Sequence, residues 1–178
     1  EPRHCDRDEQ EDEGVRVEQH AQRPPGNPVA PSLAEPGYPP LGAGRLALAT
    51  DSTLHLIEPL GFSLDDKHVR RTGLDYWHDV KLRVWKSLDD LLGNADPGAR
   101  FWYLSTKASA SPWTTAFKPG DFLVFGRETK GLPENLIQSA GDQALRIPMA
   151  PGGTRSLNLS TAIAIVLYEA VRQQHPAW

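Results

Sequence analysis

The chain has 178 residues, enough for one domain with a sizeable hydrophobic core, and a formal net charge of −4. Residues 1–40 carry 4 basic and 9 acidic side chains, whereas residues 41–178 carry 15 basic and 14 acidic side chains. Neither part has the net positive charge that is typical of a nucleic-acid-binding protein. The single cysteine excludes an internal disulfide, the six histidines lack the spacing of a zinc site, and no apolar run approaches the roughly 20 residues of a membrane span.

The first 43 residues differ in composition from the rest. Residues 1–40 contain half of the 16 prolines and no Ile, Phe, Trp or Met. Such a segment buries too little apolar area to offset the entropy lost on ordering, so we expect residues 1–43 to be disordered or atypical. From Gly44 onward the composition is typical of a globular protein, which predicts one folded domain over residues 44–178. Because no signal-peptide pattern is present, the expected compartment is the cytoplasm.

Strand and helix patterns alternate along the globular part. The predicted elements are the end of a helix at 45–49, a strand at 54–57, helices at 65–71 and 87–92, strands at 101–104 and 122–125, a helix at 132–139, a strand at 145–147 and a helix at 160–174. Ser87 and Ser160 are the predicted N-caps, and Gly93 is a predicted helix stop. Strands that alternate with helices predict an α/β fold with a mostly parallel sheet flanked by helices.

Two loops between a predicted strand and a predicted helix hold most of the polar chemistry. Residues 126–133 read Gly-Arg-Glu-Thr-Lys-Gly-Leu-Pro, and residues 147–160 contain prolines, glycines, one arginine, hydroxyls and an asparagine. Backbone donors beside a helix N-terminus can hold a polar small molecule. The Gly-rich loops of common nucleotide-binding proteins and the Gly-x-Ser-x-Gly nucleophile turn are absent from the sequence. The two loops therefore predict a ligand site of another kind.

Basic side chains cluster in two places. One cluster is Lys67, Arg70 and Arg71, and the other is residues 81–86, with Lys81 at its start. Side chains three and four apart on a helix share one face, so the first cluster could contact RNA phosphates. Charge clusters are also the ordinary composition of a solvated face, and composition alone leaves both interpretations open.

Several stretches resemble one enzyme family. Phe125-Gly126-Arg127-Glu128-Thr129-Lys130-Gly131-Leu132-Pro133 and Arg155-Ser156-Leu157-Asn158-Leu159-Ser160 resemble motifs 2 and 3 of the SPOUT (SpoU-type) RNA 2′-O-methyltransferases. Leu56-Ile57-Glu58-Pro59-Leu60-Gly61-Phe62 and Gly73-Leu74-Asp75-Tyr76 are similar to the small tRNA wobble-position (cytidine/uridine) 2′-O-methyltransferases. The resemblance covers about residues 44–174. It implies a trefoil-knotted α/β fold, S-adenosylmethionine as cofactor, tRNA as substrate and an obligate homodimer.

The resemblance also implies roles for individual residues. Those implied to line the cofactor pocket are Leu104, Gly126, Ile147 and Ser156. Those implied to be catalytic are Arg45, Glu128, Ser156 and Asn158. Those expected to bind RNA phosphates are Lys67, Arg70, Arg71 and Arg155. Because an arginine is a poor base, Arg45 is expected to grip a phosphate and orient the ribose hydroxyl. Methyl transfer from a sulfonium needs no metal.

Each of these residue types also has a structural explanation. Leu104 and Ile147 could be core residues, and Arg45 could be an ordinary surface arginine of a helix. Glu128 could stabilise the start of a helix through its dipole. Asn158 could cap a helix or brace the loop instead of touching substrate. Tyr168 matches a tyrosine near the dimer interface of the family, but it could be a half-buried helix tyrosine.

The N-terminal part departs from the family pattern. Motif 1 typically reads Glu-Pro-x-Ile-Pro-x-Asn-Thr-Gly-Asn before the arginine helix, and the corresponding residues 35–44 lack the Asn-Thr-Gly-Asn element. The apolar first strand of the family is also not visible, so we expect this strand to be missing or atypical. A shifted reading frame or wrong start, and a genuine extension, are both open explanations. Three functions remain open: an active tRNA methyltransferase, an RNA- or cofactor-binding dimer without turnover, and a 2′-O-methyltransferase acting on another RNA.

Overall fold

Successive side chains of a strand point to opposite faces of its sheet, and apolar side chains cover both faces here. The computed structural model describes residues 30–33, 41–60, 75–127, 130–175 and 177. Six parallel strands form one sheet in the order β3-β2-β1-β5-β4-β6. The strands are β1 (Ala30–Leu33), β2 (Leu54–Ile57), β3 (Leu82–Trp85), β4 (Phe101–Leu104), β5 (Phe122–Phe125) and β6 (Ala144–Leu145).

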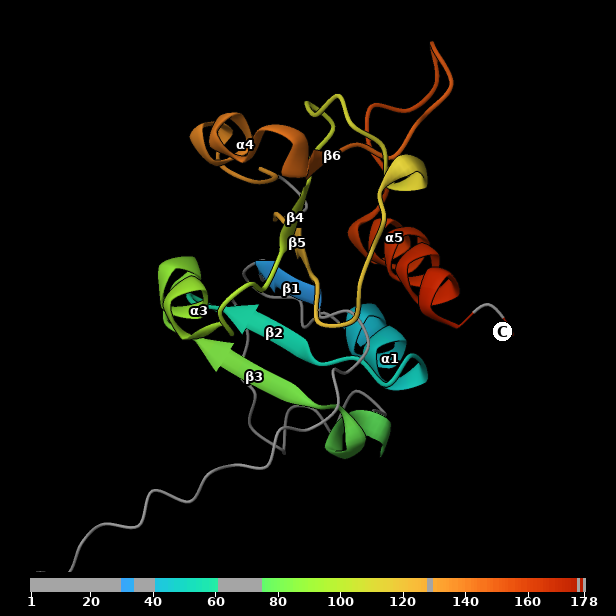
Figure 1. Ribbon diagram of the computed structural model, residues 1–178. Helices are drawn as coiled ribbons and strands as arrows, with labels where there is room; N and C mark the ends of the chain where they lie inside the picture. Colours follow the sequence, from blue (N-terminus) through green and yellow to red (C-terminus); the bar gives the residue numbers. More distant parts are fainter. Residues whose placement is uncertain (1–29, 34–40, 61–74, 128–129, 176, 178) are drawn as a thin grey trace, which may run out of the picture.

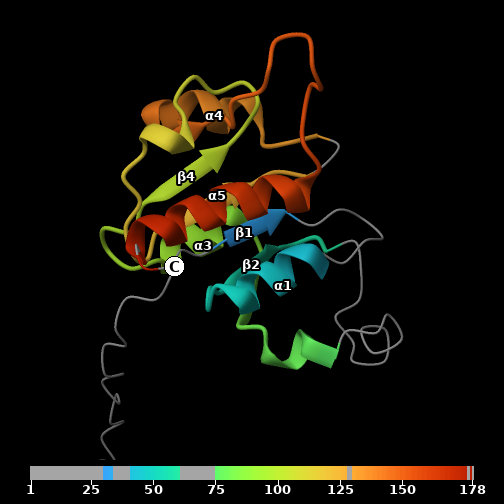
Figure 2. The same ribbon diagram turned by 90° about the vertical axis from the view of Figure 1, so that its right-hand side faces the viewer.

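Helices cover the two faces of this sheet, as Figures 1 and 2 show. Helices α1 (Leu41–Ala49) and α5 (Leu159–Gln174) lie side by side on one face, and α3 (Leu88–Asn94) and α4 (Glu134–Ala140) lie on the other. Short 3-10 turns are η1 (Asp75–Asp79), η2 (Pro112–Thr114) and η3 (Gly141–Gln143). The predicted α/β fold with a parallel sheet is confirmed, whereas the knot stays a prediction. Within the described ranges, no helix has the length and apolar character needed to cross a bilayer.

The apolar core consists of one cluster on each face of the sheet. In β5, Leu123 and Phe125 pack with residues of α1 and α5, while Val124 packs with residues of α3 and α4. All three side chains are almost fully buried. This alternation explains why the apolar run of β5 carries no polar side chain: both of its faces lie in the core.

The first strand, expected to be missing or atypical, is present and atypical. Residues Ala30–Leu33 form β1 at the centre of the sheet, in register with β2 from Ala30–Leu54 to Leu33–Ile57, and Ser32 pairs with Phe125 of β5. The strand is atypical, because Ala-Pro-Ser-Leu has no β-branched residue and Pro31 cannot donate a backbone hydrogen bond. Backbone pairing with β2 and β5 holds this strand in the sheet. The low strand propensity of its residues is why the sequence did not predict it.

Other boundaries differ from the prediction by a few residues. Helix α1 begins at Leu41, three residues before the predicted start of the folded domain at Gly44. Of residues 1–43, the structure describes 30–33 and 41–43. Strand β3 was not predicted, and β6 ends at Leu145 instead of residue 147. The predicted helix at 65–71 also lies outside the described residues.

The helix caps are partly as predicted. The Ser87 hydroxyl accepts a hydrogen bond from the Asp90 N–H at 3.0 Å, so Ser87 caps α3. Gly93 does not stop this helix, because α3 continues through Asn94. The predicted cap at Ser160 is wrong: the Asn158 side-chain oxygen accepts from the backbone N–H groups of Ser160 and Thr161, which makes Asn158 the N-cap of α5.

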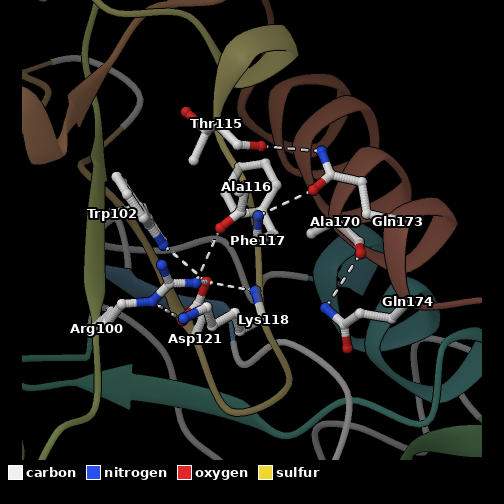
Figure 3. A network of polar contacts seen from close by, with 10 residues as sticks. All are labelled: Arg100, Trp102, Thr115, Ala116, Phe117, Lys118, Asp121, Ala170, Gln173 and Gln174. Atoms are coloured by element: carbon white, nitrogen blue, oxygen red, sulfur yellow. Dashed lines mark hydrogen bonds and ion pairs between the residues drawn. The ribbon is translucent and has the colours of Figure 1, made fainter.

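A buried carboxylate ties β4 to the loop that precedes β5 (Figure 3). The Asp121 side chain is 3% exposed and accepts hydrogen bonds from the Arg100 guanidinium, the Trp102 indole N–H and the Lys118 backbone N–H. The Gln173 side chain connects the same loop to α5, since it accepts from the Phe117 N–H and donates to the Thr115 carbonyl. These contacts fix the loop against the end of α5.

Replacing Asp121 with alanine is expected to lower the free energy of unfolding by about 3 kcal/mol. The substitution leaves the Arg100 charge and the Trp102 N–H without their buried acceptor, which costs more than losing one exposed ion pair. Urea unfolding followed by circular dichroism measures the change. The exposed Asp142→Ala variant serves as the control, and a loss below about 1 kcal/mol for Asp121→Ala would contradict this account.

His55 of β2 is buried in its neutral form. Burial, with a smaller contribution from the nearby Arg83 charge, lowers the pKa of His55 from 6.5 to about 4. The Trp85 indole N–H donates to His55 Nδ1 at 2.9 Å, and the two rings stack. This hydrogen bond uses the lone pair that protonation would occupy, so it also favours the neutral form.

The buried imidazole predicts a loss of stability in mild acid. Because the pKa of His55 in the folded protein lies below that of the unfolded chain, the unfolded state binds the proton first as the pH falls through 6.5. Between about pH 7 and about pH 5, this group is expected to remove about 2 kcal/mol of the free energy of unfolding. The measurement compares urea midpoints of the wild type with those of His55→Gln. An equal pH dependence in the two proteins would contradict the prediction.

Candidate functional site

A cavity of about 370 Å³ opens at the carboxyl ends of the strands β4, β5 and β6. This edge is where loops of open parallel sheets form ligand sites. The walls combine apolar side chains, backbone groups and cations. The lining residues are Leu104, Ser105, Thr106, Lys107, Phe125, Gly126, Arg127, Lys130, Gly131, Leu132, Leu145, Ile147, Met149, Arg155, Ser156, Leu157, Leu159 and Ala162.

The loop after β5 folds back on itself at one wall of the cavity. The Gly131 N–H donates to the Arg127 carbonyl at 2.7 Å, and Gly131 has a φ of 65°, a conformation that favours glycine. Gly126 is buried under this turn. A Cβ atom there would lie 2.6 Å from the Gly131 carbonyl oxygen, and closer still to the Gly131 carbonyl carbon and the Leu132 nitrogen. The turn requires glycine at position 126.

The loop before α5 and the start of this helix also line the cavity. The Thr154 hydroxyl donates to the Ser156 carbonyl at 2.8 Å, and the Asn158 cap fixes the point at which the helix begins. The first turn of α5 is also adjacent to α1, because a Cβ atom on Gly42 would lie 2.8 Å from Ser160 Cβ. The start of α1 therefore lies beside the helix end that lines the cavity.

The structure brings the four predicted cofactor residues together. Leu104, Gly126, Ile147 and Ser156 all line the one cavity, although they come from three separate stretches of the chain. The predicted RNA contact Arg155 lines it as well. Leu104 and Ile147 also pack against the core cluster on the α5 face, so they belong to the core as well as to the cavity wall, and their role in holding a cofactor stays a prediction.

Two other predicted residues, Arg45 and Asn158, are described by the structure and do not line the cavity. Asn158 is the N-cap of α5 and is absent from the lining. Arg45 is exposed on α1, with its Cζ atom 4.9 Å from the centre of the Tyr76 ring. Glu128, together with the basic residues predicted to contact RNA at Lys67, Arg70 and Arg71, lies outside the described residues, and their roles stay predictions.

Three cations of the site received no individual role from the sequence, although two of them lie in the predicted ligand loop at 126–133. Lys107, Arg127 and Lys130 line the cavity together with Arg155, and no carboxylate is among the lining residues that the structure describes. Lys107 forms an exposed ion pair with Glu134 at 3.1 Å, which offsets part of its charge. A cavity mouth lined by cations attracts phosphate or carboxylate groups. The sequence signal for these cations is their position in the loops that follow the buried strands β4 and β5.

The cavity fits a nucleoside with an amino-acid tail. Its volume is in the range of small-molecule pockets, and Leu104, Ile147 and Leu157 offer apolar surface for a flat base. Gly126 and Gly131 have no side chains, so their backbone groups can contact a bound nucleoside directly. Lys130 and Arg155 can pair with the carboxylate of the amino-acid tail. Within residues 30–33, 41–60, 75–127, 130–175 and 177, no cluster of three potential metal ligands occurs.

The parallel sheet and the loop-built cavity at its carboxyl edge define an α/β ligand-binding protein. Its family follows from the comparison with known proteins: the SpoU rRNA methylase family matches residues 42–168, and the chain belongs to this family. A protein of Polaromonas sp. (strain JS666) named tRNA (cytidine(34)-2′-O)-methyltransferase is 45% identical over 155 residues, covering 82% of this chain and 94% of that protein.

Solved structures agree with this assignment. A structure described as giving insights into the 2-OH methylation of C/U34 on tRNA superimposes with a TM-score of 0.73 and 40% identity, covering 84% of this chain and 98% of the other. The AdoMet-bound rRNA methyltransferase from Sinorhizobium meliloti superimposes with a TM-score of 0.66 and 25% identity, covering 84% of this chain and 56% of the other. Each of these similarities thus covers 84% of the chain.

Proposed function

We propose that this protein transfers a methyl group from S-adenosylmethionine to the ribose 2′-hydroxyl of the wobble nucleotide, position 34, of a tRNA. The observation that carries the proposal is the convergence of Leu104, Gly126, Ile147 and Ser156 on one cavity of suitable size. The high identity to a protein named for this reaction supports the choice of substrate.

The cavity supplies the site for the methyl donor. When bound, the donor provides a methyl group already activated by its attachment to a sulfonium. The apolar walls and the backbone of Gly126 and Gly131 hold the nucleoside part, and Arg155 and Lys130 are available to its carboxylate. The protein then has to place the ribose hydroxyl in line with the methyl carbon and assist the loss of its proton.

Arg45 acts on the RNA and not on the donor. The residue does not line the cavity, its guanidinium is always protonated, and its planar fork of donors matches a phosphate. Arg45 therefore grips the backbone beside the target nucleotide and orients the hydroxyl. Lys107 and Arg127, which line the cavity, extend the positive surface toward the same backbone.

The active form is a homodimer in the cytoplasm, where tRNA is found. Tyr168 of α5 is 46% exposed, and two elements that pack against α5 also expose a large apolar side chain: Leu48 of α1 at 37% and Trp113 of η2 at 48%. Val84 of β3 is exposed at 40%. Large exposed apolar side chains favour burial against a second copy. Light scattering on a sizing column tests the dimer, and Tyr168→Glu is expected to shift it toward monomer.

A methylation assay tests the proposed function. The purified protein is incubated with S-adenosylmethionine and unmodified tRNA transcripts, and 2′-O-methylated nucleotides are located by mass spectrometry after nuclease digestion. Methylation at position 34 is expected. Calorimetry with the donor is run beside it: donor binding without product would select the binding-dimer alternative, and product formed only on ribosomal RNA would select another substrate.

A further inference from the structure

The Arg45 guanidinium lies over an aromatic ring. Its Cζ atom is 4.9 Å from the centre of the Tyr76 ring, within the range of a cation–π interaction. Arg45 belongs to the exposed face of α1, and Tyr76 belongs to η1, a separate element that packs against α1. The two residues are thus brought together by the fold and not by their places in the sequence.

The residue next to Tyr76 holds this ring in place. Trp77 is 9% exposed and packs into the core cluster that contains α1 and α5. Its indole contacts the helix at Gly44: a Cβ atom there would lie 3.0 Å from Trp77 Cε3 and closer still to Cζ3. Arg45 follows Gly44 in the sequence, and Tyr76 precedes Trp77. The contact between Gly44 and Trp77 therefore sets the position of Arg45 relative to Tyr76.

The kind of partner distinguishes Arg45 from two other arginines. Arg100 donates to the Asp121 carboxylate and to the Ala116 carbonyl, and Arg172 donates two hydrogen bonds to Glu169. Those guanidinium groups use their N–H donors within the protein. No carboxylate of the described residues pairs with Arg45, and an aromatic face attracts a cation without accepting its in-plane N–H groups.

We infer that Tyr76 is a positioning residue for methyl transfer, which holds the Arg45 guanidinium over its ring so that the N–H donors of Arg45 stay directed at the RNA phosphate and ribose. The inference rests on the proposed function, since it assigns Arg45 to the substrate. An exposed arginine has many rotamers, and restricting them before the RNA arrives reduces the entropy lost on binding. The Gly44–Trp77 contact fixes the geometry of this restriction.

The first experiment replaces Tyr76 with leucine and with phenylalanine. Tyr76→Leu removes the aromatic face and is expected to lower the single-turnover rate of tRNA methylation by about 10-fold. Tyr76→Phe keeps the face and is expected to stay within about twofold of wild type. Both variants are expected to bind S-adenosylmethionine with wild-type affinity by calorimetry. Thermal unfolding identifies a folding defect, and Tyr76→Met replaces the leucine variant if that variant does not fold.

A double-mutant cycle then tests whether Tyr76 acts through Arg45. In the Arg45→Ala background, Tyr76→Leu is expected to change the methylation rate and the affinity for tRNA by less than about twofold. Affinity is measured with S-adenosylhomocysteine bound, so the cycle can be completed even if the Arg45→Ala rate is too low to measure. Equal effects of Tyr76→Leu in both backgrounds, or a wild-type rate for Tyr76→Leu, would overturn the inference.

Failure of this inference can be told apart from failure of the proposed function. If the wild-type protein methylates no tRNA although it binds the donor, the proposed function is wrong, and affinity for tRNA alone decides the cycle. If wild type is active and Arg45→Ala is equally active, then Arg45 has no role for Tyr76 to support, and the inference falls while the proposed function stands.

Discussion

Replacing Arg45 with alanine is expected to lower the rate of tRNA methylation by at least about 100-fold while changing the affinity for S-adenosylmethionine by less than about threefold. The separation of the two effects follows from position, since Arg45 lies outside the cavity lining and its neighbour Tyr76 does too. Losing a positioned guanidinium affects the placement of the ribose and leaves the donor pocket unchanged. Single-turnover kinetics and calorimetry measure the two quantities.

The matched variant is Arg45→Lys, which keeps the charge and loses the planar fork. Its rate is expected to fall between those of wild type and Arg45→Ala, because an ammonium contacts a phosphate as a point charge. An alanine variant with wild-type turnover would remove the role assigned to Arg45. A parallel loss of donor affinity would show instead that α1 supports the cavity.

Replacing Gly126 with alanine is expected to weaken S-adenosylmethionine binding by about 100-fold or more, with loss of methylation in proportion. The added methyl group would overlap the backbone of Gly131 and Leu132, which no rotamer change can relieve. The turn must therefore move, and the cavity wall moves with it. Calorimetry with the donor measures the effect.

Gly93→Ala is the control for this substitution. Gly93 lies exposed in α3 and has open space where the Cβ atom would be placed. Alanine there is expected to raise the free energy of unfolding by about 0.5–1 kcal/mol, because glycine is a poor helix former, and to leave donor binding unchanged. Wild-type donor affinity in Gly126→Ala would show that the turn after β5 is not part of the donor site.

Two of the predicted strands consist of continuous apolar residues. Phe101–Leu104 and Phe122–Phe125 have core on both faces, so four apolar residues in a row identified each of them. Leu82–Trp85 was missed because it is an edge strand with an exposed Arg83, and its flanking lysines were interpreted as a charge cluster. Ala30–Leu33 was missed because its place in the sheet depends on neighbours far along the chain.

The site was predictable where it consists of sequence motifs. The resemblance to motifs 2 and 3 implies Gly126 and Ser156 as pocket residues, and both line the cavity. Lys107 and Lys130 were not identified, because their place at the cavity depends on how the loops fold back. Asn158 was correctly given a capping explanation beside its catalytic one, and the cap is what the structure shows. The pairing of Arg45 with Tyr76 joins distant elements, so no local pattern reveals it.

The place of β1 in the sheet has a consequence for how the chain folds. This strand joins the β2–β3 half to the β5–β4–β6 half, and on the latter side Ser32 meets Phe125. A pairing of such large sequence separation closes a long loop, which slows folding relative to local pairing. On a ribosome, which releases the N-terminus first, the early strands would wait unpaired on one edge until β5 emerges. We therefore expect nascent chains that end before residue 125 to be the species most exposed to aggregation and to chaperone binding.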